Sequence, residues 1–322
     1  MAARVRRLAV VSLILGAGAV SVSAQKPKDD VNRIGSRKVG NCINFYSFEK
    51  EMALGKQLAR EVQKQAKLVD DPLITEYVNR LGQNLVRSSD AKIPFSFQIV
   101  EGDAPNAFAL PGGYVFVYTG LMKIASEEDE LAAAMAHEIA HVAARHMTCQ
   151  ATKSELAGIA GMPASVLLGG WGGYAARQAA GLALPAAFLH LSRKDESEAD
   201  YLGVQYMYAA GYDPNGAISV FEKIESLNRR QPGVVDRVFS THPMDADRIA
   251  KTEREIARIL PDKPQYVVTT SEYASIRDRL IDQQALHKTE DASRPALHRA
   301  TGRPGTSTGD DRPTIKRRDL IY

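Results

Sequence analysis

The sequence predicts an α+β fold: a mainly helical body with a small β-sheet that lines a cleft. Most apolar residues between positions 45 and 287 recur at the three- and four-residue steps of amphipathic helices. Three short segments, 95–100, 114–118 and 265–270, instead alternate or gather β-branched and aromatic residues, as strands do. Helices therefore form most of the body, and we expect one folded domain over residues 45–287.

Residues 1–24 have the features of a secretory signal peptide. Three arginines in the first seven residues precede an apolar run over 8–22, and small residues lead to Ala24. An uncleaved membrane anchor is the alternative, but a run of about 15 residues is shorter than the roughly 20 that a spanning helix needs. We therefore expect cleavage after Ala24 and export, most simply to a bacterial periplasm.

Charge and cysteine content limit the possible partners and compartments. The 322 residues include 41 basic and 38 acidic side chains, and a net charge of +3 gives no reason to expect nucleic acid or an anionic membrane as a partner. Cys42 and Cys149 could form one disulfide in an oxidising compartment or remain free, because sequence does not show whether they are neighbours. Neither cysteine has the spacing of a zinc ligand.

The predicted domain begins with two helices. A polar extension covers residues 25–44, and helical periodicity then starts near Leu54. Asp71 is placed to cap the second helix, with Pro72 at the first helical position. The apolar face of that helix consists of Ile74, Val78, Leu81 and Leu85.

Two strands and a turn-rich connection follow. The connection, residues 106–113, joins the strands predicted at 95–100 and 114–118. The second strand either presents an edge on which an extended peptide docks or lies buried in the sheet. Ser126 and Asp129 resemble a capping box, which opens a helix predicted to run from about residue 127 to 146.

The segment after this helix is uncharged from residue 156 to 176. It contains six glycines and Pro163, which are poor helix formers, so it is a weak candidate for a membrane span. We expect a mobile lid or plug over the cleft. A peripheral membrane contact through residues 150–190 is the alternative.

The second half of the domain is helical. Helices are predicted over 193–210, from Asp213-Pro214, from His242-Pro243 to a point before Pro261, and over 271–286. Residues 288–322 contain almost no apolar side chains, and we expect this tail to be disordered.

The pentapeptide His137-Glu138-Ile139-Ala140-His141 is the most informative motif. Residues four apart share one face of a helix, so the two imidazoles can meet at one metal ion. Glu138 lies beside them as a candidate general base. Two surface histidines flanking a glutamate are the plain alternative.

A hydrolytic zinc site needs a third protein ligand and one open position. Glu196 and Asp200 lie on one face of the helix that begins near residue 193. Glu196 can bind the metal, and Asp200 can accept the second ring N–H of a ligand histidine. A solvated acidic helix start is the plain alternative. Glu198 points elsewhere, and His146 is off the ligand face and predicted to be structural.

Four separate stretches resemble, in order, the motifs of the gluzincin zinc metallopeptidases, the family that includes HtpX, BepA and the CaaX prenyl proteases. The matching stretches are Asn106–Gly113, His137–His141, Ser192-Arg193 with Glu196–Asp200, and Ser240–Pro243 with Arg248. The resemblance extends over roughly residues 45–260. The resemblance is strongest to the soluble, periplasmic subgroup that includes BepA. The tetratricopeptide-repeat domain of BepA is not expected in this chain.

The resemblance implies one zinc ion per chain with His137, His141 and Glu196 as ligands and Glu138 as general base. It implies an endopeptidase that hydrolyses misfolded or misassembled cell-envelope proteins, so the partners are unfolded protein substrates. A latent chaperone or assembly factor with a plugged zinc site is the alternative function. A non-enzymatic interaction module with an accidental zinc site is a third. The oligomeric state is unknown.

The resemblance also implies roles that spacing alone does not indicate. Asn106 would hold the substrate or the developing oxyanion. His242 would stabilise that oxyanion or occupy the open zinc position in a latent state, and Arg248 would support substrate binding in that region. The plain alternatives are that Asn106 is a turn residue and that His242 opens a helix.

Overall fold

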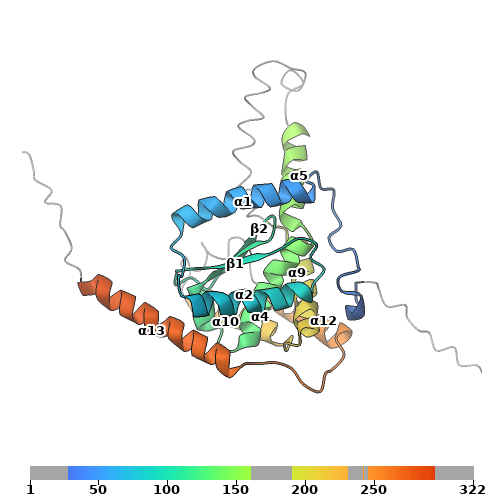
Figure 1. The fold of residues 1–322 in the computed structure, drawn as a ribbon. Coiled ribbons are helices and arrows are strands. Elements are labelled where there is room, and N and C mark those ends of the chain that lie inside the picture. The colour runs from blue at the N-terminus through green and yellow to red at the C-terminus, as the bar shows by residue number, and fades with distance from the viewer. Residues whose placement is uncertain (1–27, 161–190, 231–241, 243–245, 294–322) are drawn as a thin grey trace, which may run out of the picture. The chain divides into compact units, whose positions relative to one another are not determined.

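A computed structural model describes residues 28–160, 191–230, 242 and 246–293 (Figure 1). The predicted signal peptide, residues 161–190 of the predicted lid and residues 294–322 of the predicted tail lie outside the described residues. The chain divides into two compact units at residues 281 and 282. Of the second unit, residues 282–293 are described, as the end of a helix.

Two helices open the first unit, as their periodicity predicts. Helix α1 spans Phe48–Gln65 and is capped by the Ser47 side chain. Helix α2 spans Pro72–Arg87, with Asp71 accepting the amides of its first turn. The predicted apolar face of α2 is buried: Ile74, Val78, Leu81 and Leu85.

The sheet has three strands, β1 (Ser96–Val100), β2 (Ala107–Leu110) and β3 (Tyr114–Tyr118). It lies between α1 and α2 in Figure 1, and its order is β1-β3-β2. β1 runs parallel to β3, and β2 pairs with β3 antiparallel. One expectation was wrong, because part of the turn-rich connection 106–113 is strand β2. Of the two alternatives for the segment 114–118, the buried strand is confirmed: β3 is central and presents no edge for a peptide.

Two glycines explain how β2 can turn back onto β3. Gly112 and Gly113 have φ of 79° and 86°, a left-handed conformation that side chains disfavour. A Cβ atom at Gly113 would also lie 2.2 Å from the carbonyl oxygen of Pro94. The tight turn that made this segment look like a loop is thus the tip of a hairpin.

Helices α3 (Thr119–Ile124), α4 (Glu128–Ala143) and α5 (His146–Ala160) follow. The N-cap of α4 is Glu127, which forms a reciprocal capping box with Glu130, so the predicted Ser126–Asp129 box was wrong. The predicted single helix 127–146 was also wrong, because α4 ends at Ala143. Arg145 has a φ of 59°, which breaks the helix and starts α5 in a new direction.

Helix α9 (Arg193–Ala210) packs against α4 over most of its length. Ser192 and Asp195 form its capping box, and Gly211 ends it with a φ of 93°. Gly203 lets the two helices approach closely, because a Cβ atom there would lie 3.3 Å from the backbone nitrogen of His137. The two halves of the candidate metal motif are therefore held side by side.

The remaining helices are α10 (Gly216–Arg230), α12 (Ala246–Ile259) and α13 (Ser271–Ser293). The strand predicted over 265–270 was wrong: only Val267 forms a bridge, with Tyr212, and no named strand pairs with it among the described residues. Helix α13 extends beyond the predicted end near residue 286. No glycine or proline occurs between 287 and 293, and the first proline beyond is Pro295.

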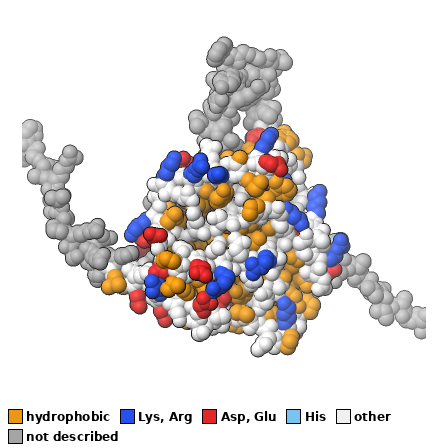
Figure 2. Space-filling model, in the orientation of Figure 1, with side chains coloured by type: hydrophobic (Ala, Val, Ile, Leu, Met, Phe, Trp, Pro, Cys, Tyr) orange, Lys and Arg blue, Asp and Glu red, His pale blue; other side chains and the backbone are white. Residues whose placement is uncertain are grey.

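Helix α4 is the centre of the first unit and contacts α2, α9, α10 and the sheet. Its middle is fully buried, with small and apolar side chains that include Leu131, Ala132, Met135, Ala136, Ile139 and Ala140. Such alanines let several neighbours approach the α4 backbone at once. On the face shown in Figure 2, basic and acidic side chains are interspersed. No described helix is long and apolar enough to cross a membrane.

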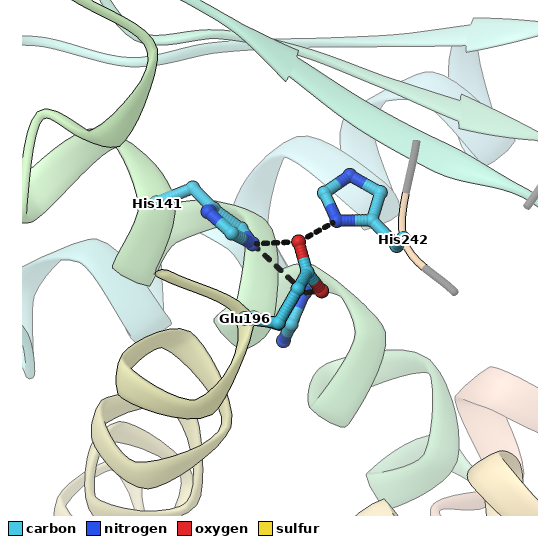
Figure 3. Close-up of side chains that lie close together, drawn as sticks. His141, Glu196 and His242 are labelled. Carbon is cyan, nitrogen blue, oxygen red and sulfur yellow. Dashed lines mark hydrogen bonds and ion pairs between the residues drawn. The ribbon is translucent and has the colours of Figure 1, made fainter. Parts of the chain in front are cut away.

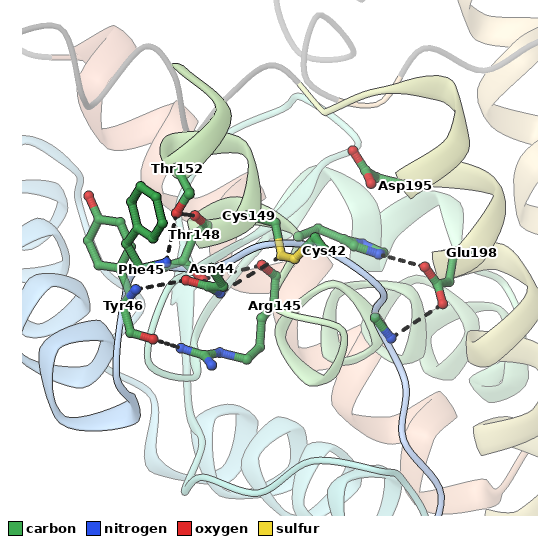
Figure 4. Close-up of a disulfide and its surroundings, with 12 residues drawn as sticks. Cys42, Asn44, Phe45, Tyr46, Arg145, Thr148, Cys149, Thr152, Asp195 and Glu198 are labelled. Carbon is green, nitrogen blue, oxygen red and sulfur yellow. Dashed lines mark hydrogen bonds and ion pairs between the residues drawn. A yellow bond between two sulfur atoms is a disulfide. The ribbon is translucent and has the colours of Figure 1, made fainter. Parts of the chain in front are cut away.

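The N-terminal segment, residues 28–47, is attached to this body at two points. Arg37 and Asp90 form a buried ion pair at 2.8 Å. Cys42 and Cys149 form a disulfide that joins the segment to α5 (Figure 4). The pairing left open by the sequence is therefore made.

Replacing both Cys42 and Cys149 with serine is expected to lower the free energy of unfolding by about 2–4 kcal/mol. The disulfide closes a loop between residues 107 positions apart, and opening it gives the unfolded chain more conformational freedom. Urea unfolding of the oxidised wild type and the double variant measures the difference. A reducing agent should bring the wild type to the value of the variant and leave the variant unchanged. Equal free energies for the oxidised wild type and the variant would contradict the prediction.

Candidate metal centre

Helix α4 presents His137 and His141 toward one point. Their Nε2 atoms lie 2.9 Å apart, and both side chains are buried. Helices α2, α9 and α10 and the sheet pack around α4, which encloses both rings. The two imidazoles that the sequence spacing predicts to meet are brought together.

Glu196 reaches the same point from the first turn of α9. Its Oε2 atom lies 3.4 Å from Nε2 of His137, and its Oε1 atom lies 3.5 Å from Nε2 of His141. The capping box at Ser192 fixes where α9 begins and so fixes which residue of its first turn faces α4. His242 adds a fourth donor, with Nδ1 2.8 Å from Oε1 of Glu196 (Figure 3).

The geometry of these donors fits a zinc ion. Zinc is bound tetrahedrally at about 2.0–2.2 Å by histidine nitrogen and carboxylate oxygen, which places neighbouring donors about 3.3 Å apart. The observed separations lie on either side of that value, and donor atoms of all four residues lie within 4.8 Å of one another. Imidazole and carboxylate are also the zinc donors common in hydrolytic sites. The residues that could hold the ion are His137, His141, Glu196 and His242.

Asp200 and Arg248 lie behind the cluster. Oδ1 of Asp200 lies 3.0 Å from Nδ1 of His137, the second ring nitrogen that the spacing predicts it to face. Arg248, on α12, donates to both oxygens of Asp200 at 2.7 and 2.9 Å, and its Nη1 lies 3.1 Å from Oε2 of Glu196. Burial acts to raise the pKa of Asp200, but His137 and Arg248 outweigh it and lower that pKa. Asp200 is therefore ionised at neutral pH and can hold the His137 ring in place.

Glu138 is buried on the sheet side of α4. Burial raises the pKa of its carboxyl group, while His242, His137 and a hydrogen bond with the backbone of Ala109 on β2 act to lower it. Nε2 of His242 lies 3.6 Å from Oε1 of Glu138. A carboxylate with a raised pKa next to a metal site is suited to accept a proton from water.

Asn106 lies just before β2, at the mouth of the site. A small cavity of about 40 Å³ is lined by residues that include Asn106, His137, Glu138, His242 and Arg248. The backbone of Asn106 is fixed, because its carbonyl accepts the amide of Tyr118 at 2.9 Å. The structure thus brings every predicted site residue to one place.

Sequence reasoning missed one neighbour of this site. His146 was predicted to be structural and off the ligand face, yet its Nδ1 atom lies 3.0 Å from Nδ1 of His141. The prediction assumed one continuous helix, and the break at Arg145 turns His146 back toward α4. Its other nitrogen, Nε2, lies 3.4 Å from Glu198. A glycine or proline at 144–145 would have indicated the helix break and so the contact, but the sequence has Ala144 and Arg145 there.

Replacing Asp200 with asparagine is expected to weaken zinc binding about 10–100-fold, because the His137 ring loses its charged anchor. Competition with a chromophoric chelator measures the zinc dissociation constant. Glu222→Gln, at an exposed carboxylate on α10, is the matched control and should bind zinc as the wild type does. Equal affinity of Asp200→Asn and the control would contradict the prediction.

The chain is similar to known proteins over most of the described domain. Residues 72–256 match the model of peptidase family M48. The chain is 34% identical over 251 residues to a putative beta-barrel assembly-enhancing protease of Vibrio cholerae, an alignment that covers 74% of this chain and 50% of that protein. It is 32% identical to the beta-barrel assembly-enhancing protease of Escherichia coli K12, over 67% of this chain and 45% of that protein.

A mitochondrial protein gives a similar match. The mitochondrial metalloendopeptidase OMA1 of Schizosaccharomyces pombe is 34% identical over 56% of this chain and 52% of its own length. The chain therefore spans about half the length of the curated relatives it matches. The family model covers more than half of the chain and contains both histidines and Glu196, so this protein belongs to peptidase family M48.

Proposed function

We propose that this protein is a zinc-dependent endopeptidase. The observation that carries the proposal is the meeting of His137, His141 and Glu196 at one point, with Glu138 next to them along α4. Three protein ligands with a neighbouring carboxylate are the arrangement of hydrolytic zinc sites. When bound, zinc lowers the pKa of water and polarises the scissile carbonyl.

Glu138 supplies the proton transfers. Its buried carboxylate accepts a proton from the attacking water and passes it to the leaving amine nitrogen. Its raised pKa supports this role, because a base whose pKa is closer to neutral pH can both take and release a proton. Asn106 and His242, which line the same cavity, are placed to donate hydrogen bonds to the oxyanion that develops on the carbonyl.

Strand β2 offers the substrate a place to bind. It lies at the end of the sheet order and beside Glu138, and no strand of the described residues pairs with its outer edge, so an extended peptide can pair there. Unfolded chains adopt that extended shape readily, whereas folded proteins do not. The edge therefore favours unfolded or misassembled proteins as substrates.

The natural substrates proposed here are proteins of the cell envelope. Two observations support this: relatives of about twice the length are named beta-barrel assembly-enhancing proteases, and residues 1–24 have the pattern of a signal peptide. Cleavage after Ala24 would release the chain into the periplasm. The peptidase would then remove envelope proteins that fail to assemble.

A second candidate function is a latent chaperone or assembly factor. It is favoured by the position of His242, whose Nδ1 lies within the donor cluster and 2.8 Å from Glu196. A fourth protein donor in that position would fill the place that water needs. The chain would then bind clients without cleaving them.

Glu138→Gln is expected to retain about one zinc per chain and to hydrolyse casein at least about 100-fold more slowly than the wild type. The amide keeps the shape of the side chain and cannot accept the proton. Metal analysis and casein hydrolysis of residues 25–322 measure both properties, with Glu222→Gln as the matched control. Hydrolysis by Glu138→Gln at the control rate would contradict the peptidase proposal.

His242→Ala separates the two functions. An oxyanion role predicts hydrolysis roughly 100-fold slower than the wild type, because a charged or polar donor to the transition state is lost. The latent function predicts the opposite, faster hydrolysis, because the blocked position opens. Zinc content should remain near one per chain in both cases, and the casein assay gives the direction.

A further inference from the structure

A row of polar side chains continues from His141 on the side away from the donor cluster. Nε2 of His141 faces the cluster, and its Nδ1 lies 3.0 Å from Nδ1 of His146. Nε2 of His146 then lies 3.4 Å from Oε2 of Glu198, on α9. Both rings are buried, with 1% and 2% of their surface exposed. The contact therefore has no competition from bulk water.

The proton positions along this row follow from the metal site. A histidine that binds zinc through Nε2 is neutral and has its proton on Nδ1. Nδ1 of His141 must then donate, so Nδ1 of His146 must accept. A neutral His146 that accepts at Nδ1 has its own proton on Nε2, which faces the carboxylate of Glu198. Each nitrogen thus has one consistent role.

Glu198 is itself held in place by the N-terminal segment. Its Oε1 atom accepts the backbone amide of Gly40 at 3.3 Å and forms an ion pair with Lys28. The carboxylate of Glu198 therefore lies between His146 on α5 and the N-terminal segment. The disulfide at Cys42 fixes this segment two residues beyond Gly40.

We infer that His146 is a positioning residue for the metal ligand His141: together with Glu198 it fixes the tautomer and the ring orientation of that ligand. The two ligand histidines would then be held in the same way, His137 by Asp200 and His141 by His146. Outer partners of this kind strengthen metal binding by orienting the ligand before the metal arrives. The inference rests on the proposed zinc site.

Zinc affinity and ring tautomer test this role apart from peptidase activity. His146→Leu is expected to raise the zinc dissociation constant about 10–100-fold, as the loss of an outer partner does. In His146→Asn the Oδ1 atom takes the place of Nδ1, so it should remain within about threefold of the wild type. His146→Gln puts its polar atoms one bond further out and should behave as His146→Leu does.

A purely structural role for His146 makes different predictions. The Asn and Gln variants are similarly polar. If His146 had only a packing role, His146→Asn would therefore not bind zinc more tightly than His146→Gln. Thr152→Val is the matched control: Thr152 is buried on the same helix and contacts the same N-terminal segment, but it has no contact with the row. It should bind zinc as the wild type does. Thermal unfolding of the zinc-free variants reports any loss of fold.

The tautomer of His146 can be measured in the wild-type protein, without a variant. In the zinc-loaded wild type, long-range ¹H–¹⁵N correlation of the histidine rings should show the proton of His146 on Nε2. A proton on Nδ1 of His146, or wild-type zinc affinity in His146→Leu, would overturn the inference. These outcomes are distinct from failure of the proposed function, because a wild-type protein that binds no zinc contradicts the metal centre itself.

Discussion

Helix α9 lies against α4 at Gly203, where no side chain separates the two backbones, and the other features of the site depend on this contact. His137 and His141 come from α4, whereas Glu196 and Asp200 come from α9. A Cβ atom at this crossing would already lie 3.3 Å from the backbone nitrogen of His137, so a larger residue there would push the two helices and their donors apart. The sheet, α2 and α10 then hold α4 in place from the remaining sides. The fold thus positions two helices, and the two helices position the donors.

This arrangement buries many ionisable groups, which is unfavourable unless each has a partner. Arg248 balances part of the negative charge, since it lies against both Asp200 and Glu196. The pKa of Glu196 is lowered well below its ordinary value even though burial opposes this, because His242, His141 and His137 surround it. The acidic and basic groups therefore stabilise one another in their charged or metal-binding forms. Outer contacts of this kind orient the ligand side chains before a metal binds.

The parts of the fold that were predictable are those whose cause is local in sequence. Asp71 and Pro72 define the start of α2 without help from other segments, and the four-residue spacing of His137 and His141 gives their shared face. Strand β2 was missed because its glycines mark a turn, and only the pairing with β3 shows that a hairpin surrounds that turn. The contact of His146 with His141 was missed because a helical wheel assumes an unbroken helix, whereas Arg145 takes a left-handed conformation. Long-range packing determines both features, and a single sequence does not display it.

The order of the ligands along the chain determines when the site can form. Glu196 follows the two histidines of α4 in the chain, and His242 and Arg248 come later still. A chain in which α9 is not packed on α4 has only the two imidazoles of α4 as donors at the site. The complete set of protein donors therefore exists only in the folded chain. An unfolded chain of the proposed peptidase would have no assembled site with which to cleave itself.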